Sequence, residues 1–183
     1  MAALLPTLVA DTKVDIDIKM ESAEMPKTTE NHGFTFKMKG FEGNQRLTMN
    51  TSALEAKIGA FRLITLISEN MGTAFAPFAE VFIPIALENT TYKFSSAIRK
   101  FSLKTLNNTL IALGLPHSLT LFTQIFTTLV PTIQDSLKKE DLKELKTLLK
   151  HLWFMIKSLN EQQPTQPTFF TADHIKGLVE LLG

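Results

Sequence analysis

From Thr51 onward, apolar side chains recur every three or four residues, which is the pattern of helices with one buried face. The first run opens with Ser52 and Glu55, whose side chains can each satisfy a free backbone N–H of the other. It ends at Gly72, a residue that readily takes the left-handed conformation at a helix C-terminus. Its apolar positions are Leu54, Ile58, Phe61, Ile64 (or Leu63) and Ile67. The whole pattern predicts six helices, near residues 52–71, 73–88, 91–113, 116–138, 139–160 and 171–182.

Residues that start and stop helices mark the later boundaries. Gly114 ends the third predicted helix, and Pro116 suits the first turn of the fourth, where the missing proline N–H would have no partner in any case. Thr171 suits the N-cap of the sixth helix, after the linker QQPTQP. The apolar stripe of the fifth helix consists of Leu142, Leu145, Leu149, Leu152, Ile156 and Leu159.

The chain before Thr51 follows a different pattern. Residues 2–11 are typical of the end of a helix, and residues 14–20 alternate charged and apolar side chains like a strand. Residues 21–33 are polar and indicate a loop or a disordered insert. Two short alternating runs within 34–50 predict an extended segment or a small hairpin. The predicted parts are the end of a preceding repeat helix (1–12), an insert or linker with extended segments (13–50), and helix pairs (51–183).

The predicted helices form recurring pairs. Gly72 and Gly114, which end the first helices of two pairs, are 42 residues apart, and Pro84 and Pro131 in the second helices are 47 apart. Helix pairs that repeat every 40–47 residues are typical of HEAT and armadillo arrays, whose pairs must stack to bury their apolar faces. The sequence therefore predicts an all-α fold, a HEAT-repeat superhelix fragment of about three helix pairs, near 51–89, 91–138 and 139–183.

A proline recurs in three octets, two apolar residues before it and a polar residue five positions after it: LLPTLVAD, FIPIALEN and LVPTIQDS. A proline inside a helix removes a backbone hydrogen bond and costs about 3 kcal/mol. At Pro84 and Pro131 it would free the carbonyls of Glu80 and Thr127 and bend both second helices alike, which suits a curved array. The alternative is that both prolines simply begin short helices in the first turn.

Composition and charge exclude several classes of function. The 183 residues carry a net charge of +1, so we expect no direct binding of nucleic acid. Cysteine is absent, which excludes disulfides, thiolate zinc sites and thiol nucleophiles. The most apolar long stretch, FAPFAEVFIPIAL, has 13 residues and contains Glu80, which is too short for a bilayer core of about 30 Å. We therefore expect no membrane insertion.

Sequence motifs of catalysis are absent. The four histidines show no metal-binding spacing, and the chain has no phosphate-binding loop, dinucleotide fingerprint or nucleophile elbow. The acid pairs Glu140/Asp141 and Asp15/Asp17 stand beside lysines and are more typical of a solvated face than of an acid–base pair. We expect no enzyme activity and no catalytic, metal-binding or cofactor-binding residue.

Two side chains of the fifth predicted helix have two interpretations each. A lone helical histidine such as His151 is more often a surface or packing residue than a ligand. Trp153 lies off the leucine stripe, and it either packs against the next helix pair or is an exposed aromatic residue for recognition.

The stretch from Gly43 to Leu106 resembles the importin-beta superfamily of nuclear transport receptors, above all its importin-5 (karyopherin beta-3) branch. GFTF (33–36) is similar to a GW-E-F-like element of that branch, and TSALEAK (51–57) is similar to its helix entry. Phe75, Phe78 and Pro84 are similar to an F-x-x-[YF]…V-x-P pattern, with one residue more between Val81 and Pro84, and Arg99 takes the place of the usual HEAT arginine. The similarity is clearest over 33–131 and stays collinear to Gly183. The polar insert before residue 34 is less acidic than in the family. This chain has about three repeats, whereas the family's receptors have about twenty.

The resemblance implies a protein-binding segment of a nuclear import receptor, which carries cargo through the nuclear pore under the control of the GTPase Ran and works in cytoplasm and nucleus. Cargo with basic localisation signals would bind the concave face, which the second helices line. The corresponding cargo-facing residues here are Glu80, Glu88, Asn89, Gln124 and Asp135. Ran and nucleoporins would bind through the parent protein, because the family's Ran-binding amino-terminal repeats have no counterpart in this chain.

Two alternatives remain open. A chain of the same fold could serve as the HEAT-repeat scaffold of another complex, such as a phosphatase regulatory subunit. A chain of a different class could be a helical-bundle enzyme or ligand carrier, which would require a closed bundle with an internal polar cavity.

Overall fold

The computed structural model describes residue 3 and residues 5–9, 14–17, 31–36, 45–115 and 117–162. The chain divides into two compact units, Met1–Ala60 and Phe61–Gly183. Their boundary falls inside a helix, whereas the sequence placed the change of organisation before it, at residues 50 and 51.

The first unit contains a short helix and a three-stranded sheet. Helix α1 spans Leu5–Val9, and the strands are β1 (Val14–Asp17), β2 (Asn31–Phe36) and β3 (Gln45–Asn50). The strand order is β1-β3-β2, and β3 pairs antiparallel with both neighbours, with Val14 and His32 opposite Met49. All three strands lie within the predicted insert. The described part of the predicted helix end at 2–11, residue 3 and residues 5–9, is helical.

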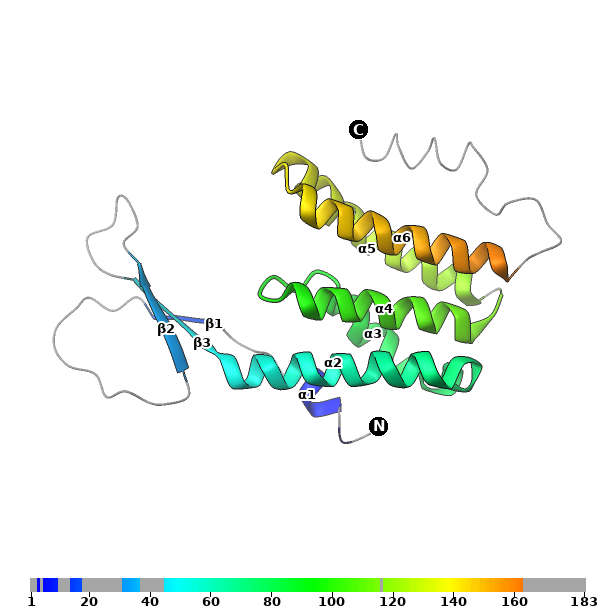
Figure 1. The fold of residues 1–183 in the computed structure, drawn as a ribbon, viewed down its shortest axis with the longest axis horizontal. Coiled ribbons are helices and arrows are strands. Elements are labelled where there is room, and N and C mark those ends of the chain that lie inside the picture. Colours follow the sequence, from blue (N-terminus) through cyan, green and yellow to red (C-terminus); the bar gives the residue numbers. More distant parts are fainter. Residues whose placement is uncertain are drawn as a thin grey trace. The chain divides into compact units, whose positions relative to one another are not determined.

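The second unit is helical in all its described residues apart from short turns, which confirms the all-α prediction for this unit (Figure 1). Its elements are the end of α2 (Thr51–Met71), the 3-10 helix η2 (Gly72–Phe78), α3 (Ala79–Asn89), α4 (Ser96–Leu113), α5 (His117–Lys138) and α6 (Leu142–Glu161). The predicted helix at 171–182 lies outside the described residues.

Glycines end helices where the sequence predicted. Gly72 follows α2 with φ +52°, and Gly114 follows α4 with φ +65°, values at which a Cβ atom is disfavoured. The predicted second helix, 73–88, begins as the 3-10 helix η2 and becomes α-helical at Ala79.

Two predicted helix starts were too early, because the capping residues stand later in the chain. Helix α4 begins at Ser96, because Ser95 is its N-cap: the Ser95 hydroxyl accepts a hydrogen bond from the Ile98 N–H at 3.3 Å. Helix α6 begins at Leu142, since the Asp141 carboxylate accepts from the Glu144 N–H at 3.0 Å. The residue before that cap, Glu140, has φ +55° and interrupts the helical path.

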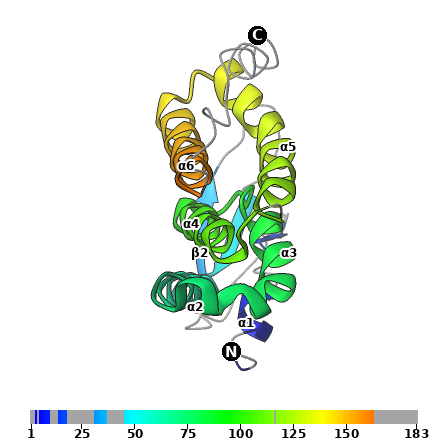
Figure 2. The same ribbon diagram turned by 90° about the vertical axis from the view of Figure 1, so that its right-hand side faces the viewer.

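The helices of the second unit lie in two layers. Figure 2 shows α4 and α6 in one layer with the part of α2 that belongs to this unit, and α3 and α5 in the other. Helix α4 packs against η2, α3, α5 and α6, and α5 packs against α6. Successive helices thus alternate between the layers.

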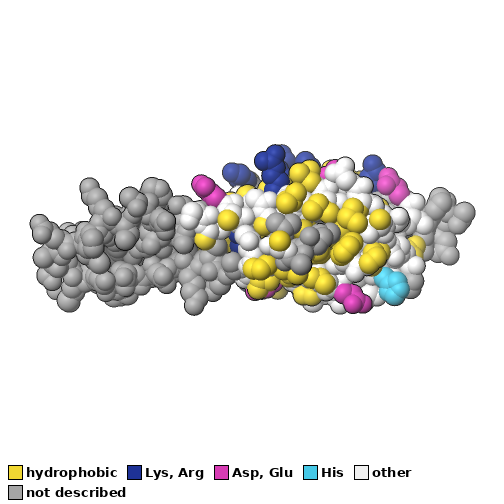
Figure 3. All heavy atoms as spheres, turned by 90° about the horizontal axis from the view of Figure 1, so that it is seen from below, with side chains coloured by type: hydrophobic (Ala, Val, Ile, Leu, Met, Phe, Trp, Pro, Cys, Tyr) yellow, Lys and Arg dark blue, Asp and Glu magenta, His cyan; other side chains and the backbone are white. Residues whose placement is uncertain are grey.

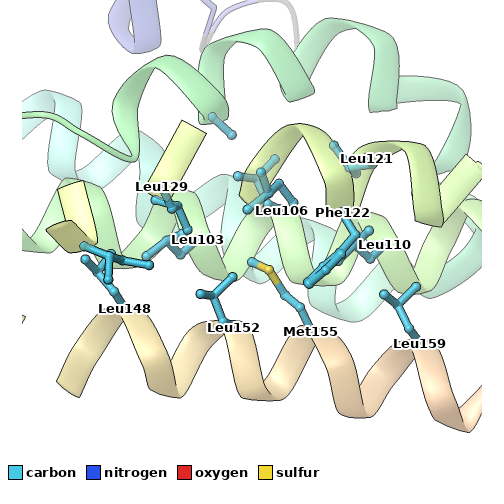
Figure 4. Close-up of a cluster of buried hydrophobic side chains, with 13 residues drawn as sticks. Leu103, Leu106, Leu110, Leu121, Phe122, Leu129, Leu148, Leu152, Met155 and Leu159 are labelled. Atoms are coloured by element: carbon cyan, nitrogen blue, oxygen red, sulfur yellow. The ribbon is translucent and has the colours of Figure 1, made fainter. Parts of the chain in front are cut away.

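An apolar core fills the space between α4, α5 and α6 (Figure 4). Leu106 and Leu110 of α4 meet Ile125 and Leu129 of α5, and Met155 of α6 completes the contact; all five are fully buried. The other buried members are Ala86, Leu103, Leu121, Phe122, Ile133, Leu148, Leu152 and Leu159. Truncation of one such leucine to alanine would cost about 2–5 kcal/mol.

Polar contacts join α2 to α4 within the first layer. The buried hydroxyls of Thr65 and Thr105 lie 3.0 Å apart, and Thr65 Oγ1 is 2.8 Å from the Phe61 carbonyl oxygen, to which it donates. Asn108 Nδ2 donates to Ser68 Oγ at 3.0 Å. This group is called the α2–α4 seam below.

Polar contacts also join α4 to α6. Arg99 bonds to Glu144, Ser158 Oγ donates to Asn107 Oδ1 at 3.4 Å, and Gln162 Nε2 donates to the Leu110 carbonyl at 3.1 Å. The partners advance together along both helices, so α4 and α6 run parallel.

Candidate functional site: the outer faces of the two layers

Pro84 and Pro131 both lie in the interior of their helices, α3 and α5. This confirms the prediction that these prolines stand inside helices and do not begin them. Both side chains are exposed. Pro6, by contrast, stands in the first turn of α1, where the first-turn alternative applies. Because proline has no N–H, the carbonyls of Glu80 and Thr127 receive no backbone bond from the residue four positions later.

An exposed stripe surrounds each interior proline, with members four residues apart. On α3 the stripe consists of Glu80, Pro84 and Glu88, and on α5 it consists of Thr127, Pro131 and Asp135. We call these the proline stripes. Residues four apart share a helix face, so each proline, the freed carbonyl before it and the acid after it lie on one outer side.

Asn89 does not belong to the exposed face on which the sequence analysis placed it. Its side chain is only 4% exposed, and Nδ2 donates to the Ile85 carbonyl of its own helix at 2.8 Å. Ser136, at the equivalent place after Pro131, is buried too. The polar residue five positions after Pro84 and after Pro131 is thus an internal residue, because one further residue turns the side chain about 100° around the helix.

The other predicted cargo-facing residues are exposed. Glu80 and Glu88 lie on α3, and Gln124 and Asp135 lie on α5 of the same layer. Asp135 pairs with Lys139 at 2.7 Å, an exposed contact one turn apart on the surface. Surface pairs of this kind contribute at most about 1 kcal/mol, so a partner could replace Lys139 at little cost.

Neutral hydroxyl groups flank Gln124 on α5. Thr123, Thr127 and Thr128 each donate to the carbonyl oxygen four residues earlier, at 3.0, 2.9 and 2.8 Å. These hydroxyl protons are used within the helix, so the three threonines offer a partner acceptor oxygens and no donors, as the carboxylates of the proline stripes do.

The layer of α4 and α6 carries the two residues whose roles the sequence left open. His151 is buried, and its burial together with the positive charges of Lys100, Lys150 and Lys104 lowers its pKa from 6.5 to about 4. It is therefore a neutral packing residue at pH 7. Trp153 is 63% exposed, so it does not pack into the described core.

A metal centre is not found among the described residues, where no three His, Asp or Glu side chains lie together. One described stretch, Ser52–Asn89, passes the length and composition requirements for a membrane span, and 22% of its apolar 18-residue window is buried. The α-helix is interrupted at Gly72 within that stretch. That the chain does not insert into a membrane stays a prediction.

No protein-family model matches the sequence, and no curated protein matches it either.

Proposed function

We propose that the chain is a protein-binding segment of a nuclear import receptor, built from HEAT-type helix pairs that stack into a curved solenoid. The observation that carries the proposal is the equivalence of α3 and α5. Both lie in one layer, both contain an exposed interior proline, and both place an exposed acid four residues after it. Equivalent surfaces on successive helices of one layer are what a repeat protein presents to an extended partner.

The binding mechanism follows from the groups on the proline stripes. Helices α3 and α5 each offer a carboxylate, Glu88 or Asp135, and a carbonyl oxygen that proline deprives of its usual N–H partner four residues later. Lysine and arginine side chains carry only donors, so both kinds of acceptor suit them. A basic localisation signal in extended form would make many weak contacts of this kind along the layer.

Exposed apolar side chains support stacking with further helix pairs. Leu63 and Leu66 of α2 and Val81 of α3 are each more than 40% exposed. Figure 3 shows apolar side chains gathered across the described part of one face of the molecule. In a HEAT array, the neighbouring pair would cover such a face and remove it from water.

The test is the binding of a fluorescent peptide rich in lysine and arginine, followed by anisotropy at low and physiological salt. Reversing both acids, Glu88→Lys with Asp135→Lys, should weaken binding by about tenfold or more, since like charges then face the peptide. The matched control is Glu69→Lys, an exposed acid on α2 in the other layer, together with Glu161→Lys on α6. The control pair changes the net charge equally and should leave affinity within about twofold.

Asn89→Ala separates the exposed acids from the buried amide. It removes the internal bond to Ile85, so stability should fall by about 1 kcal/mol while affinity for the peptide stays unchanged. In the parent protein, Ran in its GTP-bound form should release the peptide. Absence of peptide binding would favour a scaffold of another complex. If both charge-reversed double variants lose the same affinity for the peptide, the binding is general electrostatic attraction and the proline stripes are not a site.

A further inference from the structure

A row of exposed side chains runs along the outer side of α4, opposite to the proline stripes. Its members recur at helical spacing and change in character along the helix. They are Lys100, Lys104, Asn107 and Ile111, of which Asn107 is half-buried and the others are exposed. A corresponding row on α6 consists of Lys143, Thr147, Lys150, Phe154 and Lys157.

The two rows lie side by side because α4 and α6 are parallel and bonded in register. Arg99 contacts Glu144 near one end, and Asn107 contacts Ser158 further along. Asn107 is itself a member of the α4 row, and Arg99, Glu144 and Ser158 are each adjacent in sequence to a member of the rows, so the rows border the line of contact between the helices. We call this surface the α4–α6 face.

Positive charge gathers at one end of the α4–α6 face. The ammonium groups of Lys100, Lys104 and Lys150 all act on the imidazole of the buried His151, which places the three charges near one another. In the part of the chain that the structure describes, none of these three lysines forms an ion pair with a carboxylate. Glu144, the nearest acid in sequence on that side of α6, is already bonded to Arg99.

Apolar surface follows at the other end. Phe154 and Ile111 are 43% and 45% exposed, and the ammonium of Lys150 lies 5.8 Å from the centre of the Phe154 ring. In the direction from the N-termini to the C-termini of both helices, Lys100, Lys104 and Lys150 therefore come first and Phe154 and Ile111 next. Lys157, beyond Phe154 on α6, is paired with Glu161 at 3.7 Å.

We propose that the α4–α6 face binds a short acidic segment of a partner protein, with carboxylates on Lys100, Lys104 and Lys150 and a large apolar side chain against Phe154 and Ile111. The charge of the segment complements the three lysines, which repel one another in the free protein. The apolar residue covers surface that is otherwise in water. The proposal is independent of the import function, because basic cargo would bind the opposite layer.

The size and charge of the face select a peptide over larger anionic surfaces. Nucleic-acid binding through the backbone commonly uses six to ten phosphate contacts, and recruitment to anionic lipid uses clusters of about four to eight basic residues. Here Lys100, Lys104 and Lys150 form the cluster, and Lys143 and Lys157 stand at the two ends of the α6 row, the latter paired with Glu161. The whole chain has a net charge of only +1. An acidic segment of a few residues matches this charge.

The test uses a fluorescein-labelled peptide in which a run of glutamates precedes phenylalanine and leucine, with a glutamine-for-glutamate peptide as the matched probe. The full chain should bind the first peptide at least about tenfold more tightly than the second. Lys104→Glu should weaken binding of the first peptide by about tenfold or more. The matched control is Lys138→Glu on α5, an exposed lysine in the other layer with the same change of charge, which should leave affinity within about twofold.

The ring protons of His151 give a second readout by NMR. Carboxylates bound beside the three lysines offset their field, so the pKa of His151 should rise when the acidic peptide is added. Equal losses in Lys104→Glu and Lys138→Glu would overturn the proposal. So would tighter binding of duplex DNA or anionic vesicles than of the peptide, or an equal rise of the His151 pKa with inorganic phosphate at the same charge concentration.

Discussion

Arg99 on α4 donates two parallel hydrogen bonds to the carboxylate of Glu144 on α6, from Nε to Oε1 at 2.8 Å and from Nη2 to Oε2 at 2.7 Å. The third nitrogen, Nη1, donates to the Tyr92 carbonyl at 2.8 Å in the turn before α4. Both charged side chains are less than 20% exposed. One arginine therefore fixes the next helix of its own layer and the turn that precedes its own helix.

Removal of either partner of this ion pair should destabilise the protein. We expect Glu144→Ala to lower the free energy of unfolding by about 1–3 kcal/mol, because it leaves the partly buried guanidinium without its carboxylate. Urea unfolding of Arg99→Ala, Glu144→Ala and the double variant that combines them gives the coupling energy between the two residues. Exchange of the two residues, Arg99→Glu with Glu144→Arg, should not restore stability, since Tyr92 then loses its donor. A coupling energy near zero would contradict the argument.

Two glycines should respond to alanine with opposite signs. Gly72 has φ +52° while Gly59 lies inside α2, and a Cβ atom at either position meets nothing within 4 Å. Only backbone terms therefore differ. Gly72→Ala should destabilise the protein by about 1–2 kcal/mol, and Gly59→Ala should stabilise it by about 1 kcal/mol. Thermal or urea unfolding measures both, and a stabilising Gly72→Ala would show that the left-handed residue is not required there.

Stability should fall in mild acid because of His151. Its pKa is 6.5 in the unfolded chain and about 4 in the fold, so the unfolded state takes up a proton first as the pH falls. The contribution is fully present above pH 6.5 and is lost between there and about pH 4, on the order of 3 kcal/mol in all. His151→Gln should remove this part of the pH dependence. The control His117→Gln, on an exposed residue of α5, should keep it.

Replacement of Pro84 tests the shape of α3. Pro84→Ala supplies an N–H for the Glu80 carbonyl and removes an intrinsic cost of about 3 kcal/mol. The net gain should be much smaller, because η2 and α4 pack against α3 in its present form. The new amide of residue 84 should be protected from hydrogen exchange, and the angle between α3 and α4 should change in a crystal structure of the variant. An unprotected amide would mean that the helix keeps its proline geometry for other reasons.

Helix ends were predictable where one residue type has one physical use. Gly72 and Gly114 provide the positive φ that ends a helix, and the periodic apolar residues around Pro84 and Pro131 placed both prolines inside helices. The start of α4 was less clear, because apolar and aromatic residues continue through the turn before Ser95. In KKED, several polar residues could begin α6, and only the structure distinguishes the cap at Asp141.

Surface positions were harder to predict than helices. Helix α3 is apolar on nearly every side, so its sequence did not show which side faces water. Asn89 was predicted to be exposed, but it follows the exposed stripe by one residue and is buried. The α4–α6 face was missed because Lys104 and Lys150 are far apart in the sequence. Their proximity depends on the packing of α4 on α6, although the spacing of Lys100 and Lys104 already indicated one basic side of a helix.

The α2–α4 seam differs from the apolar core in its response to force. Hydroxyl and amide groups, such as Thr65 with Thr105 and Asn108 with Ser68, can exchange their bonds for bonds to water at a net cost of about 1 kcal/mol each. Separation of the leucines between α4, α5 and α6 has no such substitute. Mechanical strain should therefore concentrate in the seam, which acts as a compliant joint, while α4, α5 and α6 move as a stiff block.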